Sequence, residues 1–179
     1  MQCIAGAKHG GAEAFFTRLV LALHRTGLDQ RVVLRANPGR EKQLTDGGVT
    51  AQTLAFGGKL DISTRLKLRR EIARYKPQVV LSWMSRATEF CPPPRARFVH
   101  CGRLGGYYDL KYYHACDHLV GNTRGIVRYL VDRGWPEARV HYLPNFVSAG
   151  AVEPVPRRNL STPDDCAVIL ACLLYTSPS

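Results

Sequence analysis

Two adjacent glycines, Gly10 and Gly11, stand between a short apolar stretch and an amphipathic segment, and Glu13 follows them closely. Glycine lets a ligand approach the backbone, and the first turn of a helix offers unpaired N–H groups to an anion. The helix dipole adds about 0.3–1 kcal/mol at an exposed site and up to about 2 kcal/mol when partly buried. The pattern predicts an anion site. A plain tight turn, with Glu13 as an acidic residue at the helix start, is the structural alternative.

A histidine and an arginine mark a second segment that could do chemistry. His100 comes at the end of a predicted strand, RFVHC, and a glycine-rich loop with Arg103 and Tyr107 follows it. In open α/β sheets, ligands lie beyond the carboxyl ends of the strands, and Arg86 follows the neighbouring strand in the same layer. His100 is therefore a candidate catalytic residue, although a lone histidine is often structural and the tyrosines could simply pack the loop.

Cations also concentrate on one predicted helix, residues 62–75. A basic amphipathic helix can lie on an anionic lipid surface, where each nearby Lys or Arg contributes about 1 kcal/mol. The alternative is a helix that covers the sheet and turns its charged side to water. The cations in and just after this segment are Arg65, Lys67, Arg69, Arg70, Arg74 and Lys76.

Several familiar ligand motifs are absent from the sequence. It contains no G-x-G-x-x-G, and its second strand ends at Arg35, where an NAD-binding protein has Asp or Glu. The hypothesis of an NADP-dependent enzyme is supported by Arg35 alone and is the least favoured of the functions considered. No Gly-Lys-Ser/Thr follows a strand, which argues against a P-loop. The six cysteines include no C-x-x-C pair, which favours reduced thiols over disulfides or a zinc site.

The elements that position these residues alternate along the chain as short strands and helices. Parallel strands need crossover connections, so this alternation predicts an α/β fold, a Rossmann-like doubly wound parallel sheet. About six or seven strands precede Pro144. The predicted strands are residues 2–5, 31–36, 49–56, 78–83, 97–101, 117–121 and 139–143. The predicted helices are residues 12–26, a short one ending near 45, 62–75 and 123–133.

Length and composition limit the protein further. The chain has 179 residues, 45% of them hydrophobic and 22% charged, typical of a soluble globular protein. We predict one Rossmann-like domain at 1–147, a linker at 148–165 and, at 166–179, the cut-off start of a second domain plus a tail resembling vector sequence. No apolar run is long enough for a membrane span, and no leader peptide is expected. The net charge of +11 points to an anionic partner such as a lipid surface, a nucleic acid or a phosphorylated small molecule.

Three motifs, taken in order, resemble the N-terminal domain of retaining family-4 glycosyltransferases of the GT-B fold (glycosyltransferase group 1). They are AGAKHGGAEAFFTRLVLALHRTG, YKPQVVLSWM and DHLVGNTRGIVRYLVDRGWPEARVHYLPNFV. They span about Ile4 to Val147, one of the two Rossmann-like domains of that fold. The resemblance therefore implies the acceptor-side domain of a truncated enzyme, inactive or nearly so by itself.

The resemblance also implies ligands and residue roles. It implies a nucleotide-sugar donor, a saccharide or lipid-linked acceptor, no metal or other cofactor, and a cytoplasmic location with peripheral contact to an anionic membrane. Gly10 and Gly11 would face the donor diphosphate. His100 would be catalytic and approach the transferred sugar. The residues expected to line the acceptor cleft are Arg86, Arg103 and Tyr107.

A basic nucleic-acid-binding α/β domain is the alternative function. The sequence pI of about 9.7 and the loop of tyrosines and arginines support it. The cations are spread along the chain, however, and no recognised nucleic-acid motif occurs. Steep salt dependence of RNA or DNA binding would favour this alternative. In the favoured interpretation, nucleic acid is not a partner.

Overall fold

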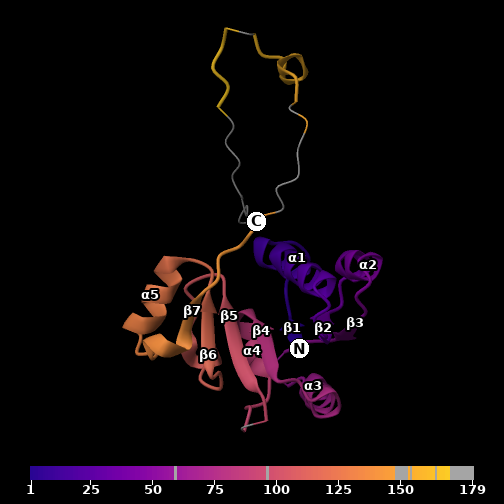
Figure 1. Cartoon of the computed structure of the whole chain (residues 1–179), viewed down its shortest axis with the longest axis vertical. Helices are drawn as coiled ribbons and strands as arrows, with labels where there is room; N and C mark the ends of the chain where they lie inside the picture. The colour runs from indigo at the N-terminus through magenta and orange to yellow at the C-terminus, as the bar shows by residue number, and fades with distance from the viewer. Residues whose placement is uncertain (59, 96, 148–152, 154, 164, 170–179) are drawn as a thin grey trace. The chain divides into compact units, whose positions relative to one another are not determined.

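The computed structural model describes residues 1–58, 60–95, 97–147, 153, 155–163 and 165–169. The chain divides into two compact units, Met1–Phe146 and Val147–Ser179. Every site residue predicted from the sequence lies in the first unit, which holds the sheet in Figure 1. In the second unit, η3 (Arg157–Leu160) is a single 3-10 turn. Residues 166–169, expected to begin a buried strand, have no regular structure; the rest of that segment lies outside the described residues.

The first unit is built on one seven-stranded sheet, parallel throughout, with the order β3-β2-β1-β4-β5-β6-β7 (Figure 1). The order reverses between β1 and β4, so the chain winds outward in both directions from the centre. This topology confirms the predicted doubly wound α/β class. The strands are β1 (Gln2–Ile4), β2 (Val32–Arg35), β3 (Ala51–Leu54), β4 (Val79–Trp83), β5 (Val99–Leu104), β6 (His118–Gly121) and β7 (Val140–Tyr142).

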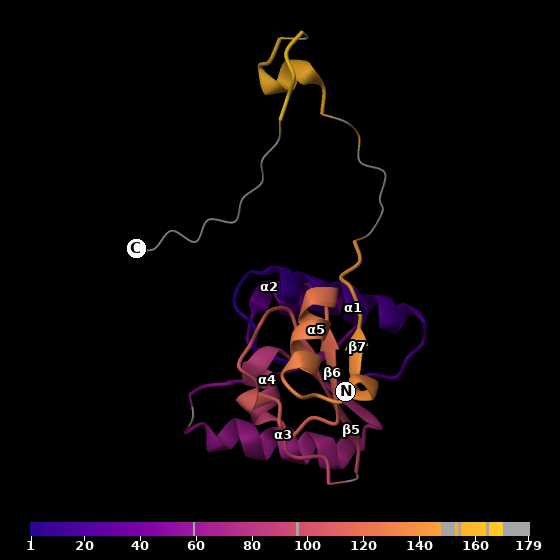
Figure 2. The same cartoon turned by 90° about the vertical axis from the view of Figure 1, so that its left-hand side faces the viewer.

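Five α-helices connect the strands and bury both faces of the sheet. They are α1 (Gly11–Arg25), α2 (Pro38–Asp46), α3 (Ile62–Tyr75), α4 (Met84–Phe90) and α5 (Arg124–Asp132). Short 3-10 turns, η1 (Leu110–Tyr112) and η2 (Glu137–Arg139), precede β6 and β7. In both views α1 and α2 lie at one end of the unit and α3 at the other (Figures 1 and 2). A ligand site at the start of α1 is thus remote from the basic helix α3.

Successive side chains of a strand point to opposite faces, so one sheet contributes to separate hydrophobic cores. Ile4 and Trp83 point to the α1 side, where they pack with Phe15 and Phe16 of that helix. Cys3, next to Ile4 in sequence, and Val80, three residues before Trp83, point to the opposite side and join the core beneath α3 and α4. A third cluster forms under α5 and the turn η1. Each strand of the centre is therefore buried on both faces, as its continuous apolar pattern predicts.

Within the first unit, the predicted elements agree with the structure except at two places. The segment 84–90 was not predicted as a helix, yet it forms α4 directly after β4, with Met84 in the left-handed region at φ 61°. Strand β5 begins and ends later than predicted, so the glycine at 102 lies inside the strand and not in a loop. Among the described residues, no helix combines the length and apolar character needed to cross a membrane.

Candidate functional site

The loop between β1 and α1 places an uncapped helix start at the carboxyl edge of the sheet. Gly10 is the N-cap residue, and its carbonyl accepts from the Ala14 N–H at 3.0 Å. No side chain of the described chain caps this helix. The N–H groups of the first turn therefore keep their hydrogen-bonding capacity for a ligand or water. A Cβ on Gly11 would meet nothing within 4 Å, so this glycine faces open space.

Glu13 holds the glycine loop in place. Its side chain is nearly buried, and Oε1 accepts a hydrogen bond from the Ala7 N–H at 2.7 Å. A Cβ on Gly6 would lie 2.6 Å from Glu13 Cγ, and one on Gly10 would overlap Glu13 Oε2. Gly6 and Gly10 are thus required by the carboxylate packed against them. Glu13 does more than begin a helix, because it fixes the loop that precedes it.

Arg40, from α2, was not predicted to belong to the site. The residue is buried, 5% exposed, and its Nη2 donates to the Ala7 carbonyl at 3.0 Å. Burial lowers the pKa of Arg40, and the nearby Glu13 carboxylate partly opposes that shift. Glu13 and Arg40 thus bind the N–H and the carbonyl of the same residue. Asn37 makes a third hydrogen bond to this loop, since its Nδ2 donates to the Lys8 carbonyl at 3.1 Å.

The loop after β5 lies at the same carboxyl edge of the parallel sheet as the glycine loop. Burial raises the pKa of Tyr108, and the negative charge of Glu13 raises it further. The Tyr129 hydroxyl donates to the Tyr108 carbonyl at 3.0 Å and fastens this loop to α5. Tyr107 is 68% exposed and stands edge-on to the Tyr129 ring at 5.3 Å. The structure therefore brings Tyr107 to the same edge of the sheet as Gly10 and Gly11.

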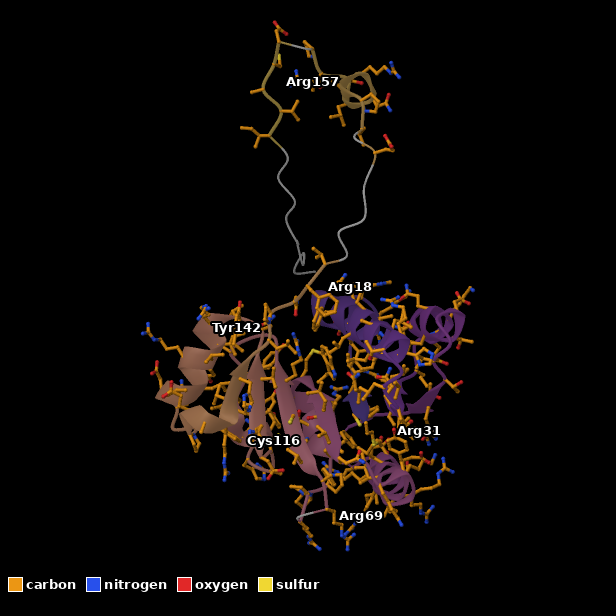
Figure 3. All side chains as sticks on the ribbon, viewed as in Figure 1. Arg18, Arg31, Arg69, Cys116, Tyr142 and Arg157 are labelled. Atoms are coloured by element: carbon orange, nitrogen blue, oxygen red, sulfur yellow. The ribbon has the colours of Figure 1, made fainter. Side chains whose placement is uncertain are left out.

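His100 does not lie at a strand end, which corrects the position predicted for it. It is the second residue of β5, and its ring is 0% exposed. Ser82 Oγ lies 2.9 Å from Nε2, and Ser82 in turn bonds Thr88 at 2.8 Å. Burial lowers the pKa of His100, so the ring is neutral at pH 7. Cys116, labelled in the interior in Figure 3, lies 3.9 Å from the same nitrogen. Such burial disfavours the direct contact with substrate predicted for His100.

Arg103 is also buried, so its predicted place in an open cleft needs correction. It is 2% exposed, and its guanidinium lies 4.7 Å from the Phe15 ring centroid and 4.6 Å from that of Trp83. Nη2 donates to Asn145 Oδ1 at 2.7 Å. Burial lowers the pKa of Arg103 to about 10. The side chain joins β5 to the segment that follows β7, because Nη2 donates to both Asn145 and the Leu143 carbonyl in that segment.

Arg86 lies on the exposed side of α4, just after the carboxyl end of β4. It makes no ion pair or hydrogen bond with any other described residue, so its guanidinium is free to meet a ligand. Ser85, beside it, approaches the Tyr113 hydroxyl at 3.3 Å. Of the residues predicted from the sequence, Gly10, Gly11, Arg86 and Tyr107 thus remain at accessible positions. No group of three or more His, Cys, Asp or Glu within the described ranges could hold a metal ion.

Comparisons with known proteins support the resemblance seen in the sequence. Residues 9–150 match the sequence profile of Glycosyltransferase Family 4. The chain is 34% identical over 166 residues to the lipopolysaccharide core biosynthesis glycosyltransferase LpsE of Rhizobium meliloti, covering 92% of this chain and 48% of LpsE. It is 33% identical to LpsD of the same organism, covering 90% of this chain and 47% of LpsD. The chain therefore spans about half the length of these relatives.

Solved structures share the fold at low sequence identity. The lipopolysaccharide outer core galactosyltransferase WaaB in its apo form matches with a TM-score of 0.64 and 14% identity, over 89% of this chain and 50% of WaaB. Anabaena HepE in complex with UDP matches with a TM-score of 0.64 and 12% identity, over 80% of this chain and 43% of HepE. At these identities the matches establish a common fold for the described sheet and nothing finer.

Proposed function

Because the chain belongs to glycosyltransferase family 4, we propose that it forms the acceptor-side half of an enzyme that transfers a sugar from a nucleotide-sugar donor to a saccharide of the lipopolysaccharide core. The names of LpsE and LpsD support the acceptor class. The structural relative HepE, crystallised with UDP and with UDP-glucose, supports a uridine nucleotide in the donor. Family membership also favours this function over a nucleic-acid-binding domain.

The observation that carries the proposal is the open first turn of α1 at the centre of the sheet. Gly11 leaves free space above N–H groups that none of the described side chains caps. In the proposed reaction the nucleoside diphosphate leaves as the sugar becomes oxocarbenium-like, with retention of configuration at the anomeric carbon. Fixed N–H groups aimed at the diphosphate would stabilise the charge that develops on it. On this proposal the reaction needs no metal ion from the protein.

The proposed acceptor surface is the edge that carries Tyr107 and Arg86. Tyr107 presents most of its ring to solvent, and an exposed aromatic ring can pack on the apolar face of a sugar. Arg86 offers up to five N–H donors to hydroxyl or acidic groups of a saccharide. Arg103, by contrast, supports this edge from below, since it holds the ring of Phe15 in the helix that bears Gly11.

We also propose peripheral contact with an anionic membrane from the cytoplasmic side, through α3. Two large apolar side chains of this helix are exposed, Ile62 by 65% and Leu66 by 48%. A groove of about 750 Å³ lies between α3 and the proline-rich residues 92–95, with Leu66 and Phe98 in its lining and Arg69 among its cations. Exposed apolar groups among cations suit a surface of acyl chains and anionic headgroups.

Binding of an acceptor to this chain tests the proposal directly. Core oligosaccharide released from lipopolysaccharide would be titrated into ¹⁵N-labelled protein, with amide shifts expected at Gly11, Gly106 and Tyr107. Tyr107→Ala should weaken the interaction several-fold, whereas Tyr142→Ala, on the exposed edge strand β7, should not. Shifts absent at the glycine loop, or binding of duplex RNA that falls steeply with salt, would contradict the proposed function.

A further inference from the structure

A small hollow lies on the α2 side of the glycine loop, separate from the open space above Gly11. Its volume is about 180 Å³, below the roughly 300–1,000 Å³ of pockets that hold drug-sized ligands. Lys8, Gly10, Glu13, Gly39 and Arg40 are among the residues that line it, and Gly11 is not. The hollow therefore has room for one small group, and a whole nucleotide would not fit.

A buried cation with an unused donor is among the residues that line this hollow. Arg40 is 95% buried, as its 5% exposure implies, and its Nη2 donates to the Ala7 carbonyl. Its Nη1 is buried and has no hydrogen-bond partner among the described residues. A buried charged donor without an acceptor is costly and uncommon in folded proteins. The incompletely paired charge of Arg40 thus favours an anion in the hollow that this residue lines.

Two helix starts add to the positive potential of the hollow. The first turn of α1 reaches it through Gly10, and the first turn of α2 reaches it through Gly39. Asn37 caps α2 by accepting from the Arg40 N–H at 3.0 Å. Lys8 is exposed at the rim, and its ammonium makes no ion pair or hydrogen bond within the described part of the chain. Helix N-termini with adjacent cations favour phosphate-like anions.

One negative charge also lines the hollow and limits the charge it can accept. Glu13 contributes its carboxylate, but Oε1 already accepts the Ala7 N–H, and the side chain packs under the loop glycines. The two positive charges of Lys8 and Arg40 exceed this single negative charge. The small volume suits a compact anion with hydrogen-bonding oxygens on several sides, and it disfavours the extended diphosphate of a nucleotide.

We propose that this hollow binds a phosphate monoester carried by the acceptor. The Arg40 guanidinium, the Lys8 ammonium, the N–H groups at the start of α1 and the Gly39 N–H of α2 would hold its oxygens. The assignment of the phosphate to the acceptor rests on the proposed function, whereas binding of the phosphate itself does not. In the full enzyme this subsite would set which phosphorylated saccharide is accepted, from a position beside the glycine loop.

Titration of the ¹⁵N-labelled chain with three probes tests the proposal. Inorganic phosphate and glucose 6-phosphate should shift the amides of Gly10 and Gly39 and the Arg40 Nε–H signal. UDP should act on Gly11 in preference to Gly39. Arg40→Met should weaken phosphate binding by at least about tenfold, since charged hydrogen bonds are lost. Lys8→Gln should weaken phosphate binding by a few-fold. Lys42 lies on α2 with Arg40 but outside the hollow, so Lys42→Gln should leave phosphate binding unchanged.

The variants separate ligand binding from loop structure. Arg40 also holds the Ala7 carbonyl, so Arg40→Met is accompanied by a thermal unfolding curve. Lys8→Gln removes only an exposed charge, so a loss there cannot come from unfolding. The proposal is overturned when neither phosphate probe shifts Gly39, when Lys8→Gln and Lys42→Gln bind alike, or when UDP displaces phosphate from the hollow. An oligosaccharide that binds without phosphate would leave the proposed function intact and remove only this subsite.

Discussion

The loop before α1 and the segment around β5 both combine glycines with polar residues, yet they differ in what surrounds the glycines. A Cβ on Gly11 would meet open space, whereas a Cβ on Gly102 would lie 2.8 Å from Tyr113, 2.9 Å from Cys116 and 3.1 Å from Leu119. The first glycine leaves room for something outside the fold. The second makes room for the protein's own side chains, so the same residue type serves two purposes.

The charged and polar groups of the two regions differ in the same way. Glu13 and Arg40 are buried, but they grip the backbone of a loop at the edge of the sheet and leave its far side accessible. His100 and Ser82 are buried and bond each other across strands β4 and β5. Polar residues near a glycine therefore indicate a ligand site only where the backbone they support remains open.

The largest expected effect comes from filling the closed region. Gly102→Ala should lower the free energy of unfolding by about 2–3 kcal/mol, because three buried side chains must move to admit a methyl group. Urea unfolding followed by circular dichroism measures the change, and Gly58→Ala, whose Cβ meets nothing within 4 Å, is the matched control. Equal stabilities for the two variants would contradict the conclusion that Gly102 is required by the side chains packed against it.

The sheet could be predicted from the sequence because its strands are short apolar runs separated by helix-length segments. Helix α3 was predicted with the bounds observed, since Asp61 caps it by accepting from the Thr64 N–H. Helix α4 was not predicted because it follows β4 without a loop, and Trp83 supplies no capping side chain. Strand β5 was cut short because Gly102 looks like a loop residue until Tyr113 is seen to pack on it.

The site could be predicted in part. Gly10 and Gly11 were placed by their position between a strand and a helix, a local signal. Arg40 had no such signal, because its bond to Ala7 joins residues 33 positions apart in the sequence. The burial of Arg103 likewise depends on Asn145, 42 positions away. Contacts over such separations follow from the strand order, which a single sequence states only indirectly.

The second largest effect on stability should distinguish the buried Arg103 from the exposed Arg86. Arg103→Met should destabilise the protein by about 1.5–3 kcal/mol, the range for a lost hydrogen bond to a charged group. Combined with Asn145→Ala, the losses should be less than additive, because both variants remove the same bond. Thermal and urea unfolding report the values. Arg86→Met is the control, and a loss as large as that of Arg103→Met would place Arg86 in the supporting structure too.

A smaller effect should appear in the pH dependence of stability. Burial lowers the pKa of His100 below its unfolded value, so the unfolded chain binds a proton more readily than the folded one. This stabilising contribution is complete above about pH 6.5 and is lost as the pH falls, by up to about 1.4 kcal/mol per pH unit. His100→Gln should flatten the decline in unfolding free energy between pH 7 and pH 5. An unchanged slope would show that the ring is accessible to protons in the folded protein, as a catalytic residue requires.

The smallest effect on stability should come from Gly11→Ala, and this variant decides what the open glycine is for. Its Cβ meets nothing, and alanine costs less conformational entropy than glycine at a helix start, so stability should be unchanged or rise by up to about 1 kcal/mol. The same methyl group would stand where a diphosphate must approach the first-turn N–H groups. UDP-induced shifts of the Ala12 amide should therefore disappear, while those caused by inorganic phosphate at Gly39 persist. Full retention of the UDP shifts would make Gly11 a simple turn residue, and the open region would then resemble the closed one in everything except exposure.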